Sequence, residues 1–172
     1  MLNALVILVT LQALGAVIGA FMAVWSEVAY VRAMADGVIS NAENAHLVHL
    51  GRGLRFGLGL LLLASLGLVI DAYARELGVQ PALTASYWIL IALSLVIIYI
   101  SWALARKKVS FALGSAAAFT AWWFLAYLTL GLLPGLTFGA AFALYVVATA
   151  IFYGLLSYVH LLVAPPSPTQ SS

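Results

Sequence analysis

Five long apolar segments constrain the fold of this chain more than any other feature of its sequence. They cover approximately residues 4–25, 53–70, 84–104, 111–133 and 136–163. An apolar run of about 18 residues or more is long enough to cross the hydrocarbon core of a bilayer as an α-helix. The sequence therefore predicts an all-α integral membrane bundle of five transmembrane helices.

The composition agrees with a membrane protein and argues against several other classes. Of the 172 residues, 66% are hydrophobic and 7% are charged, whereas soluble domains are about 45–50% apolar and about 25% charged. The absence of cysteine removes disulfides, thiolate ligands and thiol nucleophiles. A net charge of +2 is too small to favour nucleic-acid binding. We expect one transmembrane domain over residues 1–163 and a disordered polar tail over residues 164–172.

The orientation of the bundle is predicted from the positions of the cations. Most of them flank or form the first and third connections between helices: Arg32, Arg52, Arg55, Arg106, Lys107 and Lys108. Connections rich in lysine and arginine face the cytoplasm. The first apolar run has no Lys or Arg before it and is longer than a signal peptide core, so we interpret it as a retained helix. We expect the N-terminus outside and the C-terminus in the cytoplasm.

The first connection contains a turn signal followed by a helix start. Asp36-Gly37 favours a turn, and Ser40 with Glu43 forms a capping box that starts the second helix. If this helix continues to about Leu77, it has about 37 residues and a length near 55 Å, well beyond a hydrocarbon core of about 30 Å. We expect the first helix to extend past the membrane on the same side, so that helices one and two form a long hairpin.

Small residues predict how this hairpin packs. Gly15, Gly19 and Ala23 in the first helix, and Gly53 and Gly57 in the second, recur every fourth residue. Rows of this kind allow two transmembrane helices to approach closely. We therefore expect tight contact between helices one and two.

The fifth helix carries a row of polar side chains on one face. The row consists of Tyr145, Thr149, Tyr153, Ser157 and His160. Hydroxyl groups that face lipid lack hydrogen-bond partners. We therefore expect this face to be turned toward the interior of the bundle.

Residues 40–57, SNAENAHLVHLGRGLRFG, concentrate polar groups in an otherwise apolar chain. One interpretation is a solvated helix start whose cations reach the lipid headgroups. The other is a ligand site, because Glu43 with His46, or His46 with His49, are neighbours on a helix. All of them together wind around the helix and do not share one face.

The predicted topology supports the second interpretation with additional residues. Helix one ends, helix two begins and helix five ends on one side of the membrane, which brings Glu27 and His160 to that side as well. His49 and His160 are the candidate axial ligands of haem b. Glu27, Glu43, His46 and His49 are the candidate ligands of a divalent metal ion. Alternatively, Glu27 pairs with a neighbouring arginine.

Several enzyme chemistries lack their residues here. No lysine lies inside a predicted span to bind retinal, and no G-x-S-x-G, H-E-x-x-H or phosphate-binding glycine loop is present. We expect a small integral membrane binding or accessory subunit without independent catalysis. The alternatives are a haem- or metal-binding redox protein and a transporter for a small solute. The expected partners are the lipid bilayer and other membrane subunits or a second copy, and not nucleic acid.

The sequence D-G-x-I-S-x-x-E, here Asp36 to Glu43, resembles a turn found in a group of small, uncharacterised bacterial multi-pass membrane proteins. The resemblance covers about the first 75 residues and implies a multi-pass protein of the bacterial inner membrane. It implies no activity. In architecture alone, the chain is more distantly similar to the copper-resistance D family and to HemJ-type protoporphyrinogen oxidases, and no ligand residue is carried over from either.

Overall fold

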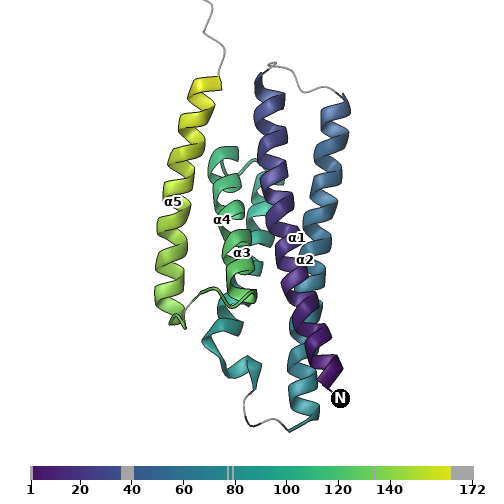
Figure 1. The fold of residues 1–172 in the computed structure, drawn as a ribbon. Coiled ribbons are helices and arrows are strands. Elements are labelled where there is room, and N and C mark those ends of the chain that lie inside the picture. Colours follow the sequence, from purple (N-terminus) through teal and green to yellow (C-terminus); the bar gives the residue numbers. More distant parts are fainter. Residues whose placement is uncertain (1, 36–40, 77, 79, 134, 164–172) are drawn as a thin grey trace, which may run out of the picture.

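The computed structural model describes residues 2–35, 41–76, 78, 80–133 and 135–163, without the side chains of residues 2–3, 30, 33–35, 41–50, 160–161 and 163. Over these ranges the chain forms five α-helices and one short 3-10 helix, and no strand (Figure 1). They are α1 (Leu2–Ala35), α2 (Asn41–Ala74), η1 (Pro81–Leu83), α3 (Ala85–Ala105), α4 (Phe111–Thr129) and α5 (Phe138–Val163).

Each α-helix contains a stretch that is long and apolar enough to cross a membrane. These stretches are Ala4–Ala29, Gly51–Ala74, Ala85–Ala105, Phe111–Thr129 and Phe138–Val159. The prediction of an all-α bundle of five membrane-spanning helices is therefore confirmed for the described residues. The chain is that of a multi-pass membrane protein, and its apolar helices form the surface that contacts lipid.

One end of the bundle gathers most of the described cations. The C-terminal ends of α1, α3 and α5 and the N-terminal ends of α2 and α4 all lie there (Figure 1). We call it the cationic end, and its described positive residues are Arg32, Arg52, Arg55, Arg106, Lys107 and Lys108. The opposite end holds an ion pair, in which Arg75 Nη2 lies 2.8 Å from Asp71 Oδ1.

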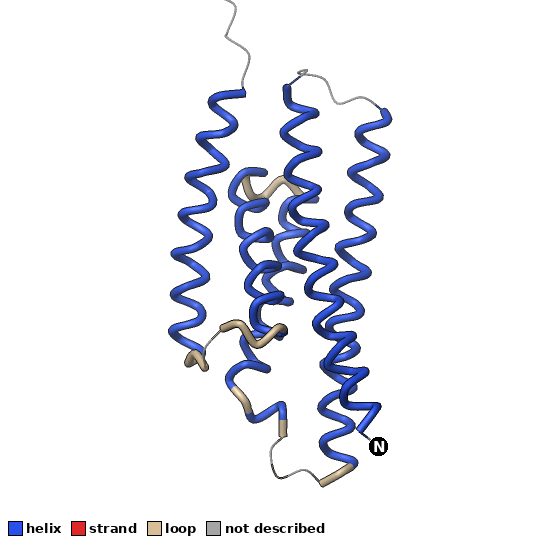
Figure 2. The backbone as a smooth tube through the Cα atoms, in the orientation of Figure 1, coloured by secondary structure: helices blue, strands red, loops and turns tan. Residues whose placement is uncertain are grey.

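The helices α1 and α2 form the long hairpin that the sequence predicts. Each has 34 residues, whereas α3 has 21 and α4 has 19. Figure 2 shows both helices continuing past the nearby ends of α3 and α4. α2 begins at Asn41, as predicted, but ends at Ala74 and not near Leu77. The residue Glu76 takes a left-handed backbone conformation, with φ 53°, that ends helical geometry there.

The glycine rows bring α1 and α2 into backbone contact, which confirms the predicted tight packing. A methyl group added to Gly15 would lie 2.7 Å from the Leu61 nitrogen and 2.8 Å from the Gly57 oxygen. One turn away, Gln12 Nε2 donates a hydrogen bond to Ser65 Oγ at 2.9 Å. These contacts fix an antiparallel register between the two helices.

The helix α4 lies at the centre of the bundle, between α1, α3 and α5. Half of its membrane-spanning residues are buried, against 17% for α5, which lies at the edge of the bundle. The ring of Trp122, which is 1% exposed, packs directly on Gly19 of α1. The absence of a side chain at Gly19 is what lets this indole enter the core.

The polar row of α5 faces the bundle interior over part of its length. Tyr145 is buried, and its hydroxyl donates a hydrogen bond to the Ala117 carbonyl at 3.1 Å. Farther along, Tyr153 is 39% exposed. α5 packs mainly on α4. A single neighbouring helix covers only part of the polar row, so Tyr153 remains exposed.

The ends of α3 and α4 are set by local signals. Pro81 starts the 3-10 helix η1, and α3 begins at Ala85, where the Thr84 side chain accepts a hydrogen bond from the Tyr87 nitrogen. α4 ends at Thr129 and does not continue to residue 133. The predicted turn at residues 36–37, the Ser40 cap and the polar tail at residues 164–172 lie outside the described residues.

Candidate functional site: a cleft between α2 and α3

A cleft of about 350 Å³ lies between α2 and α3. Its floor comes from α1 and α4, through Ala23, Ala118 and Trp122. The cleft exists because α2 packs mainly on α1 while α3 packs mainly on α4, so the two helices have little direct contact with each other. Rigid helix pairs that diverge in this way leave a concave space, the usual form of a small-molecule site between helices.

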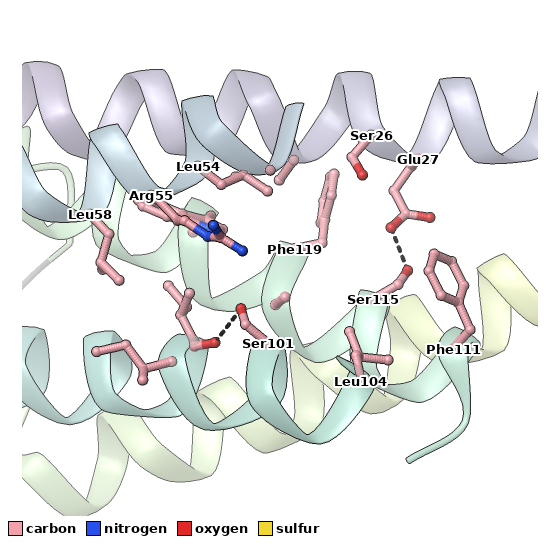
Figure 3. A pocket seen from close by; sticks show the side chains of 16 residues that line it. Ser26, Glu27, Leu54, Arg55, Leu58, Ser101, Leu104, Phe111, Ser115 and Phe119 are labelled. Atoms are coloured by element: carbon pink, nitrogen blue, oxygen red, sulfur yellow. Dashed lines mark hydrogen bonds between the residues drawn. The ribbon is translucent and has the colours of Figure 1, made fainter. Parts of the chain in front are cut away.

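The walls of the cleft are mostly apolar (Figure 3). Leu54 and Leu58 come from α2, Ile97 and Ile98 from α3, and Phe119 from α4. Ile98 is 45% exposed at the rim. A hydrocarbon group therefore has both a surface to bury against and an opening between α2 and α3 through which to enter.

A smaller number of polar groups line the same cleft: Ser26 and Glu27 from α1, Arg55 from α2, Ser101 from α3 and Ser115 from α4. The Ser115 hydroxyl donates a hydrogen bond to the Glu27 carboxylate (Figure 3). The Ser101 hydroxyl donates to the Ile97 carbonyl at 2.8 Å. Both hydroxyl protons are therefore used inside the protein, and the two oxygens can still accept hydrogen bonds.

Arg55 is the cation of the cleft. It is exposed, and Figure 3 shows its guanidinium group projecting from α2 into the cavity. In the described part of the chain, the ion pair found is that of Arg75 with Asp71, so no described carboxylate lies within ion-pair distance of Arg55. Its donors are free to bind another group.

The cleft lies within the membrane, near the cationic end. Arg55 is one turn inside the apolar stretch of α2, which begins at Gly51, and Glu27 lies two residues before Ala29, where the apolar stretch of α1 ends. The apolar wall around Leu58 lies deeper in the bilayer. The cleft thus combines a polar end near one membrane surface with an apolar end below it.

The structure brings one of the sequence-predicted site residues, Glu27, into this cleft. The backbones at Glu43, His46 and His49 lie in α2 and that of His160 lies in α5, but these four side chains lie outside the described residues. The other described side chains include no cluster of three or more groups suited to a metal ion.

The helix arrangement bears on the two cofactor predictions differently. The antiparallel register set by Gly15 with Leu61 and by Met22 with Gly53, continued by one turn, places position 49 of α2 level with Glu27. In contrast, the described parts of α2 and α5 do not pack against each other. The assignment of His49 and His160 as haem ligands stays a prediction, as does the metal site.

Neither the cleft nor the position of Arg55 on its wall was predicted from the sequence. Arg55 was interpreted with its neighbours as a cation that reaches the headgroups. The sequence feature that could have identified Arg55 is its depth, because it follows Gly51 by one turn inside a mostly apolar stretch. A cation at that position is costly unless a partner faces it.

Neither a known protein family, nor a curated protein, nor a solved structure matches this chain. The fold and the cleft define the class: a multi-pass helical membrane protein with an amphipathic cavity.

Proposed function

We propose that this protein is a small integral membrane binding or accessory subunit without independent catalysis, and that it binds an amphipathic small molecule in the cleft between α2 and α3. The observation that carries the proposal is the cleft itself, in which apolar walls and the Arg55 cation meet inside a membrane span. Its volume of about 350 Å³ lies at the lower end of the usual range for ligand sites, about 300–1,000 Å³.

The side chains of the cleft support binding more than turnover. Burial of a hydrocarbon chain against Leu58, Ile97 and Phe119 supplies affinity, and a few polar groups supply orientation. The Ser115 hydroxyl donates a hydrogen bond to the Glu27 carboxylate, a pair that activates a nucleophile for acyl transfer only beside donors that stabilise an oxyanion. Ser115 lies inside α4, where the backbone N–H groups are bonded to carbonyls of the same helix, so its neighbours do not supply these donors.

We further propose that the cationic end faces the cytoplasm, in a bacterial inner membrane. The support is the clustering of Arg52, Arg106, Lys107 and Lys108 at that end, because positively charged connections are retained on the cytoplasmic side. With this orientation the ligand enters the cleft from the cytoplasmic leaflet. Haem or metal binding is a separate proposal.

Photo-crosslinking tests the binding function. The probe is a diazirine analogue of dodecanol, a neutral amphiphile, added to the full-length protein in lipid nanodiscs. We expect mass spectrometry to find saturable labelling in the cleft segments of α2, α3 and α4. Leu58→Trp fills the cleft and should lower this labelling several-fold. Leu63→Trp is the matched control, since Leu63 lies on the same helix and is 70% exposed.

Labelling that spreads evenly over the lipid-exposed faces, and that Leu58→Trp leaves unchanged, would contradict the proposal. Loss of cleft labelling in Leu63→Trp as well would show that a bulky residue anywhere on α2 disturbs the helix. Retention in that control, with loss in Leu58→Trp, supports the cleft as the binding site.

A further inference from the structure

We infer that the ligand of the cleft is an anionic amphiphile whose carboxylate or phosphate group binds Arg55. This inference rests on the proposed function and adds the chemical class of the ligand. It starts from one feature of the cleft wall: the Arg55 guanidinium group lies inside an apolar span, projects into the cleft and is beyond ion-pair distance of every described carboxylate, Glu27 included.

The geometry of Arg55 favours an oxyanion as the partner. A guanidinium group is always charged and presents its donors in a planar fork that matches the two oxygens of a carboxylate or phosphate. In a low-dielectric surrounding, such a charge-assisted pair is stronger than the same pair in water. The oxygens of Ser101 and Ser26 line the same cavity and accept hydrogen bonds from a protonated phosphate or a bridging water.

The order of residues along the cleft places the head and the chain of the ligand. Figure 3 shows the Arg55 guanidinium between Leu58 on one side and the Glu27–Ser115 pair on the other. Leu58 lies deeper in the membrane, because it follows Arg55 by about one turn of α2. An amphiphile with its head on Arg55 therefore directs its chain along Leu58 toward Trp122.

The charges around the cleft favour an anion over a cation. Five other described cations lie at this end: Arg32, Arg52, Arg106, Lys107 and Lys108. The carboxylate on the cleft wall, Glu27, is held by the Ser115 hydroxyl on α4. The summed field therefore attracts anions to the opening. A zwitterion, with an ammonium group at Glu27, is the competing ligand class.

The test compares head groups on one chain, using diazirine analogues of dodecanol, dodecanoate and dodecyl phosphate with the full-length protein in nanodiscs. We expect the two anionic probes to label the cleft at concentrations about tenfold lower than dodecanol, from the strength of charge-assisted hydrogen bonds. Arg55→Gln should abolish this preference while dodecanol still labels, which also shows that the variant is folded. Arg55→Lys should keep part of the preference.

Arg52→Gln is the matched control. Arg52 is an exposed arginine on the same helix and does not line the cleft. It should keep the full preference for anionic probes. If Arg52→Gln and Arg55→Gln lower the preference equally, the anions respond to the general surface charge and the inference is wrong.

Competition experiments identify the source of the anion and test the competing class of ligand, a zwitterion. Competition by dodecanoate, but not by phosphatidylglycerol or inorganic phosphate, identifies a single-chain ligand. Competition by phosphatidylglycerol identifies a lipid headgroup, and both results support an oxyanion at Arg55.

Other outcomes contradict the inference. If inorganic phosphate alone displaces the probe, the ligand is not an amphiphile. Stronger labelling by dodecylphosphocholine, lost in Glu27→Gln, overturns the anion in favour of a zwitterion. If dodecanol labels but head groups make no difference, this inference fails and the proposed function stands.

Discussion

Replacing Gly15 by alanine should separate α1 from α2, and the reason is the identity of the atoms that surround the glycine. An added methyl group meets the Leu61 nitrogen at 2.7 Å, the Gly57 oxygen at 2.8 Å and the Leu61 Cα at 3.1 Å. All three are backbone atoms. No side-chain rotation relieves these contacts, so the two helix axes must move apart.

The magnitude follows from three contributions. Overpacking of this kind costs about 1–3 kcal/mol. Separation of the axes also weakens the hydrogen bond from Gln12 to Ser65, and an interhelical hydrogen bond in a membrane contributes about 0.6 kcal/mol, with a maximum near 1.7. The higher helix propensity of alanine offsets up to about 1 kcal/mol. We expect Gly15→Ala to lower the free energy of unfolding by about 2 kcal/mol.

Titration with sodium dodecyl sulfate in mixed micelles, followed by tryptophan fluorescence and circular dichroism, measures this difference. Gly59→Ala, in the partner helix α2, is the control, because an added methyl group there meets nothing within 4 Å. The Gly59→Ala variant gains the same helix propensity as Gly15→Ala but creates no steric clash. Equal unfolding midpoints for Gly15→Ala and Gly59→Ala would refute the argument that backbone contact at Gly15 holds the hairpin together.

Three further predictions follow from the packing and from the sequence. Gly19→Ala collides with the Trp122 ring and should push it toward the cleft, lowering dodecanol labelling several-fold, whereas unchanged labelling contradicts this link. If His49 and His160 bind haem, the purified protein shows a reducible Soret band that either alanine variant removes. A colourless preparation without Zn, Cu or Fe contradicts both the haem and the metal predictions. A cysteine placed at Lys107, in a chain with no cysteine of its own, should react only with reagents that reach the cytoplasm, and periplasmic labelling reverses the proposed orientation.

The features predicted correctly from the sequence are those that depend on local pattern. The length of each apolar run determines whether its helix crosses the bilayer, so the spans follow directly from the chain. Rows of small residues, such as Gly15 with Gly19, predict close approach because their meaning does not depend on which helix is the partner. The actual partners had to come from the structure: Gly15 meets α2, whereas Gly19 has its backbone near Gly57 of α2 and its open side against Trp122 of α4.

Helix boundaries were less predictable, because one residue type serves two local structures. Proline is accepted at the first position of an α-helix and equally in a 3-10 turn. At Pro81 the chain forms the 3-10 turn, and the hydrogen bond from the Tyr87 nitrogen to the Thr84 side chain then starts α3. The capping threonine, and not the proline, determined the start of the helix.

The cleft could be inferred only when the neighbours of α2 were known. Successive residues of a helix are about 100° apart, so a row at Gly53 and Gly57 that faces α1 directs Leu54 and Leu58 to a flank about a third of a turn away. Arg55 lies on that same flank, and the side chain of Arg52 projects farther round the helix. The sequence therefore contains the grouping of one cation with two leucines. It does not contain the position of α3, which packs on α4 and leaves this flank uncovered within the membrane. Because this flank is uncovered, Arg55 forms part of the wall of the cleft.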